Sequence, residues 1–290
     1  MKKRSLTIVI VSYNGSFWLK KTLQSLQEYY LSATATKVRV MLVDNHSSED
    51  VVEMVKADFS WVEVISLPEN RGFAGANNVA LKLVKSDYVM LLNPDTQLDE
   101  RSQLDRLLDR LQDEPQIGMI GPCLLLTDGR MDMACHRGEP TLWASLCYFL
   151  KLEKLFPRWR LVNGYHRQDF DLKTSHQVDA ISGAAMMIRT ETMAEVGFLD
   201  ERFFLYAEDL DWCKRFRDAG YQIWYEPAVT IIHHKNKTGI ANQDAKISGA
   251  SRQHFFNTML QYYDKHYAQQ YPKWMRQLLR VFLFVKREGI

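Results

Sequence analysis

The residues most suited to catalysis lie between positions 203 and 215, where an aromatic run leads into the acidic pair Glu208 and Asp209. This pair opens a predicted helix that runs to about Ala219 and ends at Gly220. Carboxylates also suit the positive end of a helix dipole, which is the alternative explanation for them. A carboxylate that projects from a helix start into a shielded cleft is placed to act as a general base. If it deprotonates an acceptor hydroxyl opposite a departing diphosphate, the reaction inverts the attacked carbon.

Two further segments offer ligands for a hard metal ion. Asn93-Pro94-Asp95-Thr96 follows an apolar run, and His233-His234 follows the strand-like residues 229–232. A helix-capping turn is the plain alternative for the first segment, and a structural role is the alternative for either histidine. Asp95 and one imidazole would suit Mg²⁺ or Mn²⁺ that bridges a diphosphate. Because side chains alternate along a strand, we expect only one of the two histidines to reach the site, His233 or His234.

A glycine-containing loop at residues 69–78 precedes or opens a helix and includes Arg71, Gly72 and Asn78. It is explained equally by an ordinary strand-to-helix connection built from small residues. An arginine beside a helix N-terminus, however, forms an anion site, because the guanidinium and the free N–H groups both donate to phosphate oxygens. We therefore expect this loop to stabilise a diphosphate leaving group.

Polar residues also follow the predicted strands, where parallel sheets bind ligands. Asp44 is ambiguous, because dehydrogenases of the Rossmann type also place an acid after the second strand. The first turn, Ser12-Tyr13-Asn14-Gly15-Ser16, lacks G-x-G-x-x-G and so disfavours dinucleotide binding. The candidate nucleotide-sugar contacts are Ser12, Tyr13, Asn14, Asp44, Asn45, Arg71, Gly72, Asn78, Asn93, Asp95 and Gly183.

The elements that must position these residues alternate between short β-branched runs and helix-length amphipathic segments. This rhythm predicts an α/β fold with a mostly parallel sheet flanked by helices. The expected helices begin near residues 17, 49, 74 and 101, and the expected strands are 6–11, 38–43, 62–65, 88–92 and 117–120. Regular structure is expected again over 178–188, where Ser182-Gly183-Ala184-Ala185 permits close backbone approach.

Composition indicates a globular protein with no general affinity for nucleic acid. The 290 residues are 46% hydrophobic and 25% charged, with a net charge of only +2. Four cysteines without C-x-x-C spacing indicate a reducing compartment. The start of the chain is too short in apolar residues for a signal peptide, and no apolar stretch approaches the roughly 20 residues that span a bilayer.

The predicted domain organisation is a catalytic domain over 1–245 and a C-terminal helical extension over 246–290. The catalytic domain divides into a nucleotide-binding half, about 1–121, and an acceptor-side half, about 122–245, which begins with an irregular helical insertion that covers a site. From Pro272 onward one face of the extension is apolar and the other is basic, with Lys273, Arg276, Arg280 and Arg287. A helix of this kind is typical of an anionic membrane surface, and packing on its own domain is the alternative.

The chain resembles the inverting family 2 glycosyltransferases with the GT-A fold, especially the bacterial rhamnosyltransferase-like branch. The resemblance covers roughly residues 5–240, and its motifs are specific by their order and spacing together. The motifs are Ile8–Asn14, Val43–Asn45, Asn70–Ala74, Leu92–Asp95, Ser182–Ala184, Phe204–Arg215 and Ala219-Gly220-Tyr221.

The resemblance implies a role for individual positions. Asp44 would meet the nucleotide base, Tyr13 and Asn14 would border its pocket, and Arg71 would lie near the diphosphate. By the same resemblance, the site residues matching the catalytic base and the metal ligands are Asp209, Asp95 and His233. Asn-Pro-Asp in place of two aspartates leaves one acidic ligand in its turn, and Asn236 stands where a glycine is frequent, which keeps His234 as an alternate.

The resemblance also implies a nucleotide-sugar donor, favoured as dTDP-L-rhamnose, and a lipid-linked saccharide acceptor in O-antigen, capsule or cell-wall synthesis. A UDP-hexose, UDP-N-acetylhexosamine or UDP-galactofuranose is the alternative donor. The expected location is cytoplasmic and peripheral on the inner face of the cell membrane. A non-catalytic binding module and a nicotinamide-dependent oxidoreductase are the rivals from other classes.

Overall fold

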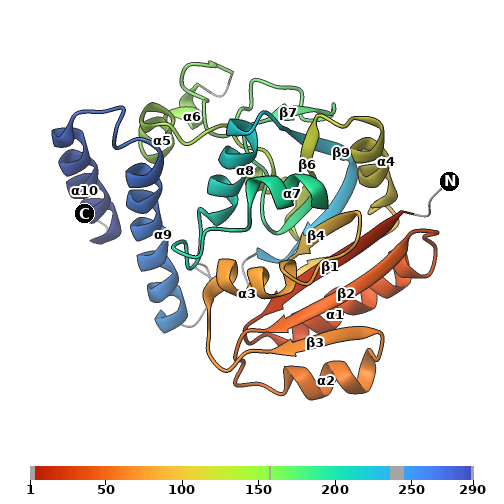
Figure 1. Cartoon of the computed structure of the whole chain (residues 1–290). Coiled ribbons are helices and arrows are strands. Elements are labelled where there is room, and N and C mark those ends of the chain that lie inside the picture. The colour runs from red at the N-terminus through yellow and green to blue at the C-terminus, as the bar shows by residue number, and fades with distance from the viewer. Residues whose placement is uncertain (1–3, 157, 236–244, 289–290) are drawn as a thin grey trace.

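A nine-stranded twisted sheet organises the computed structural model, which describes residues 4–156, 158–235 and 245–288. The strand order is β3-β2-β1-β4-β8-β6-β9-β5, and β7 pairs with β9. In Figure 1 the helices α3, α7 and α8 cover the face of the sheet that is turned to the viewer, and α1 lies behind it. The fold is thus α/β with helices on both faces, as the sequence predicts.

The first half of the sheet is parallel throughout. Its strands are β1 (Ser5–Ser12), β2 (Lys37–Asp44), β3 (Val62–Ser66) and β4 (Tyr88–Leu92), and the central residues of β1, β2 and β4 are buried. Continuous β-branched and apolar runs form such strands because both sheet faces are covered. The register pairs Ser12 with Asp44 and Asp44 with Ser66, so the polar residues that follow these strands meet at one edge.

The second half of the sheet is mixed. The strand β8 (Ala185–Arg189) runs antiparallel to both β4 and β6 (Ile117–Leu125), and β9 (Gln222–His233) runs parallel to β6. Two short strands, β5 (Thr96–Gln97) and β7 (His176–Val178), pair antiparallel with β9. Regular structure is therefore interrupted between 179 and 184, where the sequence predicts continuity, and β9 is longer than the predicted 229–232.

The helices α1, α2, α3, α4 and α8 begin within four residues of their predicted starts, and α7 is not among the helices predicted from the sequence. They are α1 (Ser16–Leu26), continued by a π-helical turn over Gln27–Leu31, α2 (Val51–Asp58), α3 (Gly72–Leu81), α4 (Asp105–Asp113), α7 (Thr190–Val196) and α8 (Glu208–Asp218). The α8 helix follows two residues with left-handed backbone, Tyr206 at φ 69° and Ala207 at φ 64°. This turn places the acidic pair at the start of α8.

The remaining helices lie to one side of the sheet. The short α5 (Leu142–Phe149) and α6 (Leu152–Leu155) belong to the irregular segment after β6, and a 3₁₀ turn spans Met133–Cys135. The pair α9 (Ala245–His266) and α10 (Lys273–Glu288) stands beside α5 and away from β1–β3 (Figure 1). The α9 helix is anchored by Tyr262, Tyr263 and Tyr267, which form a small apolar cluster with Phe203.

Among the described residues, no helix is both long and apolar enough to cross a membrane. Asn236, which bears on the choice between the two histidines, lies outside the described residues.

Candidate active site

One cavity of about 1860 Å³ gathers most of the predicted site residues at the carboxyl edge of the sheet. Asp95 and Asp209 both line it, although they come from different halves of the chain. Strand order explains this proximity, because the later strand β8 pairs with β4, and the later strand β9 pairs with β5, which follows Asp95. The predicted residues that line the cavity are Tyr13, Asn14, Asn45, Gly72, Asn93, Asp95, Gly183, Glu208, Asp209 and His233.

Five predicted residues do not line this cavity, namely Ser12, Asp44, Arg71, Asn78 and His234. Ser12 is fully buried. Asp44 is 7% exposed, and its Oδ1 accepts a hydrogen bond from the Ser47 amide at 3.2 Å. Both belong to the sheet edge that carries Asn45.

Asn78, a predicted ligand contact, lies outside the cavity and is bonded to the segment before α8. Its side chain is buried, its Nδ2 donates to the Leu199 carbonyl at 2.9 Å, and its Oδ1 accepts from the Leu199 amide at 3.1 Å. Nδ2 also reaches Glu201 Oε1 at 3.0 Å. The amide therefore ties α3 to the segment before α8. Arg71 also pairs with Glu201, at 3.2 Å, and stays more than one-third exposed outside the cavity.

The glycine loop is shaped by close backbone contacts. Gly72 has φ 69°, and a Cβ there would lie 2.3 Å from the Phe204 carbonyl oxygen. The neighbouring Phe73 amide donates to that same oxygen at 2.7 Å. Asn45 holds the loop from the other side, because its Oδ1 accepts from the Arg71 amide at 2.8 Å and its Nδ2 donates to Asn70 Oδ1 at 2.9 Å. Glycine is required here for close approach as well as for backbone conformation.

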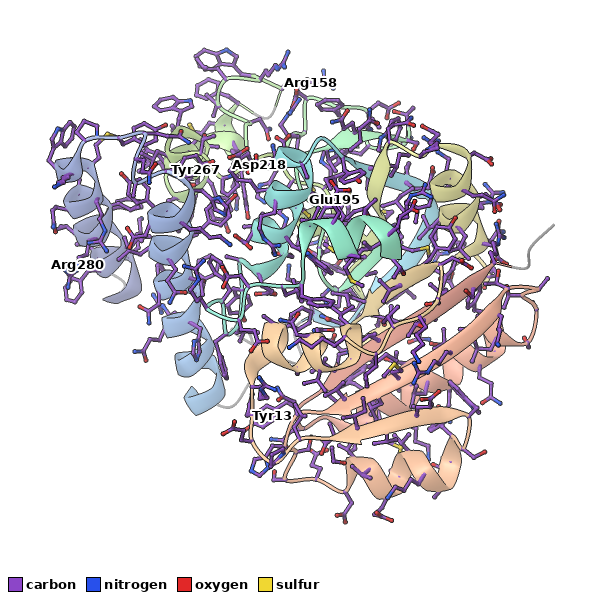
Figure 2. The ribbon with its side chains drawn as sticks, viewed as in Figure 1. Tyr13, Arg158, Glu195, Asp218, Tyr267 and Arg280 are labelled. Atoms are coloured by element: carbon purple, nitrogen blue, oxygen red, sulfur yellow. The ribbon has the colours of Figure 1, made fainter. Side chains whose placement is uncertain are left out.

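Tyr13 and Asn14 form part of the cavity rim. Asn14 has a left-handed φ of 51°, and its Oδ1 accepts from the Ser48 amide at 2.8 Å. Tyr13 is 50% exposed and lies at the end of the parallel strands (Figure 2). An exposed aromatic ring at a cavity mouth is available to stack on a planar ligand.

His233 is held between two carboxylates inside the cavity. Its Nε2 lies 3.4 Å from Asp95 Oδ1, and its Nδ1 lies 3.1 Å from Asp132 Oδ2. Burial alone would lower the pKa of His233, but hydrogen bonds to Asp132 and Asp95 outweigh it and raise that pKa to about 9. Burial would raise the pKa of Asp132, but His233 and Lys235 hold it well below its usual range. His233 and the carboxylates of Asp95 and Asp132 thus form one compact network.

His234 points to the opposite side of β9. Its Nε2 lies 3.0 Å from Gln97 Oε1, and its ring packs against Trp18 with centroids 4.4 Å apart. Strand alternation predicts that only one of the two imidazoles enters the site. The pairing of Thr96 with His233 decides which one, because it sets His233 beside the turn that carries Asp95.

The acidic pair at the start of α8 has two different environments. Asp209 Oδ2 accepts hydrogen bonds from Arg137 Nη2 at 2.6 Å and from the Gly183 amide at 3.2 Å. Glu208 is buried, and its Oε2 has no hydrogen-bond partner among the described residues. Burial, with a further contribution from Asp209, raises the pKa of Glu208 to about 8. Glu208 therefore carries a proton at neutral pH, while Asp209 is the member that is oriented by a cation.

Two residues of this site were not identified from the sequence, Asp132 and Arg137. Both line the cavity, and Arg137 is a buried cation whose pKa Asp209 raises against the effect of burial. They lie in the irregular segment after β6, where no periodicity or motif marks them. The sequence predicts only that this irregular segment covers a site.

The donor atoms near Asp95 suit a divalent cation only in part. Among the described residues no group of three or more acidic, histidine or cysteine side chains converges as a complete metal site. Asp95 Oδ1 and His233 Nε2 are 3.4 Å apart. Neighbouring ligands of an octahedral ion with bonds of about 2.1 Å lie about 3 Å apart, so these two atoms fit adjacent positions on one ion.

Comparison with known proteins identifies the class. The model of glycosyl transferase family 2 matches residues 7–190, and the chain belongs to this family. It is a family 2 glycosyltransferase, a class that does not include nicotinamide-dependent oxidoreductases.

The relatives refine this class. The chain is 28% identical over 241 residues to the N-acetylglucosaminyl-diphospho-decaprenol L-rhamnosyltransferase of Mycobacterium tuberculosis, covering 79% of this chain and 76% of that protein. It is 24% identical to the rhamnosyltransferase WbbL of Escherichia coli, covering 78% and 82%.

Solved structures support the GT-A-like fold. The mannosyltransferase PcManGT of Pyrobaculum calidifontis, in complex with GDP-Man and Mn²⁺, aligns with a TM-score of 0.62 at 15% identity, over 98% of this chain and 70% of that one. GalNAc-T7 with UDP, GalNAc and Mn²⁺ aligns with a TM-score of 0.59 at 16% identity, over 80% of this chain and 44% of that one.

Proposed function

We propose that this glycosyltransferase moves L-rhamnose from dTDP-L-rhamnose to a hydroxyl of a lipid-linked saccharide, with inversion, in bacterial surface polysaccharide synthesis. The observation that carries the proposal is the convergence of the Asp95–His233 pair and the Arg137–Asp209 pair in one cavity. The named activities of the mycobacterial and Escherichia coli relatives support the sugar and the lipid-linked acceptor.

In this proposal Asp209 is the general base. Arg137 and the Gly183 amide fix one of its oxygens, so the carboxylate keeps a single orientation toward the cavity. It takes the proton of the acceptor hydroxyl as that oxygen attacks the anomeric carbon from the side opposite the diphosphate. Glu208, which is protonated at neutral pH, would stay neutral behind it.

The leaving diphosphate would be stabilised at the other end of the cavity. Asp95 and His233 would hold Mg²⁺ or Mn²⁺, which supplies Lewis-acid stabilisation of the departing oxygens. The solved neighbours with Mn²⁺ and a nucleotide support this assignment. Tyr13 and Asn14 would border the nucleotide base, and Asp44 and Arg71 remain predicted donor contacts that would need local rearrangement to reach the ligand.

A panel of donors tests the proposal. Purified protein with Mn²⁺ and a GlcNAc-diphospholipid acceptor is incubated with dTDP-L-rhamnose, UDP-glucose, UDP-N-acetylglucosamine and UDP-galactofuranose. We expect transfer from dTDP-L-rhamnose alone, and NMR of the product should show the anomeric configuration opposite to that of the donor. Turnover with a UDP-sugar alone would establish the alternative donor, and retention of configuration would exclude Asp209 as an inverting base.

We further propose that α10 holds the enzyme on the inner face of the cell membrane. Lys273 and Arg280 are exposed, and Figure 2 shows Arg280 on the side of the molecule away from the parallel strands. Apolar residues of the same helix are also exposed, among them Trp274 at 61%. Replacing Lys273 and Arg280 together by Glu should abolish flotation with anionic vesicles, whereas Lys20→Glu with Lys56→Glu should not. Equal flotation by both would refute this role.

A further inference from the structure

The active-site cavity continues past the acidic pair into a groove between α5, α9 and α10. We call this groove the apolar arm. Its lining residues include Leu142, Leu146 and Phe149 from α5, Met259 from α9, and Leu278 and Phe282 from α10. None of the described residues that these three helices contribute to the lining is Asp, Glu, Lys or Arg. The charged lining residues of the cavity come instead from the sheet edge, the loops around it and the start of α8.

The arm is open rather than closed by its own side chains. Leu278 and Trp274 are each 61% exposed, and Leu146 is 38% exposed. Phe149 and Phe282 pack edge to face with centroids 5.5 Å apart, which joins α5 to α10 across the groove. Soluble proteins seldom leave a contiguous apolar surface of this kind in water unless it binds something.

The arm is continuous with the catalytic end of the cavity. Leu210, next to Asp209, packs with the cluster formed by Phe203 and the tyrosines of α9. The loop before α8 touches the same helix, because Phe204 stacks on His254 at 4.9 Å. A molecule whose polar head reaches Asp209 therefore finds apolar walls directly beyond it. In Figure 1, α9 and α10 lie away from β1–β3, the strands of the predicted nucleotide-binding half.

We infer that the apolar arm binds the hydrocarbon chain of the acceptor, a polyisoprenoid attached through diphosphate to the acceptor sugar. This inference rests on the lipid-linked acceptor of the proposed function. A second saccharide would need side chains that exchange several hydrogen bonds with its hydroxyls, and a peptide would need partners for its backbone. The walls of the arm supply mainly aliphatic and aromatic surface, which matches a flexible hydrocarbon chain. Among the described residues, their polar side-chain groups are limited to Ser145, His254, Thr258, the Trp274 indole N–H and the hydroxyls of Tyr148, Tyr262 and Tyr263.

The test is a membrane-free assay that varies only the lipid. Acceptors with one sugar-diphosphate head carry a butyl, a farnesyl or a longer isoprenoid tail, each kept below its micelle concentration. We expect kcat/KM of the unchanged protein to rise at least tenfold from butyl to farnesyl. Leu278→Glu should remove this rise and leave the butyl acceptor unaffected. Phe284→Glu is the matched control, because Phe284 is 54% exposed on the same helix but does not line the cavity.

Equal kcat/KM for all tails, or an undiminished rise in Leu278→Glu, would overturn the inference. A binding measurement separates this result from failure of the proposed function. A fluorescent farnesyl diphosphate analogue should bind the unchanged protein and the Phe284→Glu variant at least tenfold more tightly than Leu278→Glu, and isopentyl diphosphate should not compete. If the analogue binds in this way but no acceptor is turned over, the inference about the apolar arm is supported and the proposed reaction is refuted. Equal binding to all three proteins overturns the arm.

Discussion

Arg137 and Asp209, 72 positions apart in the chain, form an ion pair of 2.6 Å at the wall of the active-site cavity. Both side chains are largely buried, at 8% and 13% exposure, and Arg137 Nη2 also donates to the Ile181 carbonyl at 2.7 Å. Removing one member of a buried ion pair is costly, because the charge that remains is still desolvated but no longer has a partner. The pair thus couples the orientation of the proposed base to the stability of the fold.

Replacing Arg137 by Met is expected to lower the free energy of unfolding by about 3 kcal/mol, since it leaves the Asp209 carboxylate unpaired. Adding Asp209→Asn to this variant should recover most of the loss, because the remaining side chain is then neutral. Urea unfolding of the two single variants and the double variant gives the coupling energy. Strictly additive effects would contradict the importance of the pair.

Asp209→Asn is expected to lower kcat by about 10²- to 10⁴-fold, because the amide cannot accept the proton of the acceptor hydroxyl. The dissociation constant for the donor nucleotide, measured by calorimetry, should change less than about threefold. Asp218→Asn is the control, since Asp218 is an exposed carboxylate on the same helix and pairs with Lys214. Full turnover by Asp209→Asn would remove it from the mechanism.

His233→Asn is expected to abolish the increase in nucleotide affinity that Mn²⁺ produces, because one of the two proposed protein ligands is lost. His234→Asn should retain the increase, since His234 lies against Trp18 and Gln97 instead. Titration of dTDP with and without Mn²⁺ measures both. Loss of the metal effect in His234→Asn alone would reverse the assignment.

Gly72→Ala is expected to destabilise the protein by about 2–4 kcal/mol, because the new Cβ would meet the Phe204 carbonyl and the backbone conformation is also unfavourable. Gly129→Ala separates these two causes. Gly129 has φ 79° but no atom within 4 Å of an added Cβ, so only the conformational cost of about 1 kcal/mol applies. Similar unfolding midpoints for both variants would show that the contact with Phe204 is unimportant.

The contribution of His136 to the stability of the protein should fall between pH 6.5 and pH 4, while the raised pKa of Glu208 acts in the opposite sense. His136 is fully buried, and burial, with smaller effects of His176 and Arg167, lowers its pKa from 6.5 to about 4. In this window the imidazole of His136 binds a proton in the unfolded chain but not in the folded protein. Through this group, acidification favours unfolding by up to about 3 kcal/mol.

Urea unfolding at pH 7.5 and pH 5 checks this dependence. The difference in free energy of unfolding between His136→Gln and the unchanged protein should shift in favour of the variant from pH 7.5 to pH 5. His46→Gln should show no such shift, since His46 is exposed. An unaltered pH dependence in His136→Gln would assign the effect to other groups.

The sequence by itself determined the α/β class, the strands of the parallel half and the helix that begins with Glu208 and Asp209. These features depend on local periodicity and on turn residues, which act between neighbours in the chain. It also determined that only one of His233 and His234 could enter the site, because alternation along a strand is a local rule.

The family resemblance favours His233 over His234, and the tertiary structure places His233 in the cavity. The tertiary structure alone decided which face of α3 holds Asn78 and that Asp132 and Arg137 line the cavity. His233 and Asp132 are 101 positions apart, and their contact depends on strand order and register across the sheet. Such long-range pairings arise from the packing of the whole core, and no short stretch of sequence encodes them. Irregular segments carry the least local information, so the residues they contribute to an active site become visible only once the chain is folded.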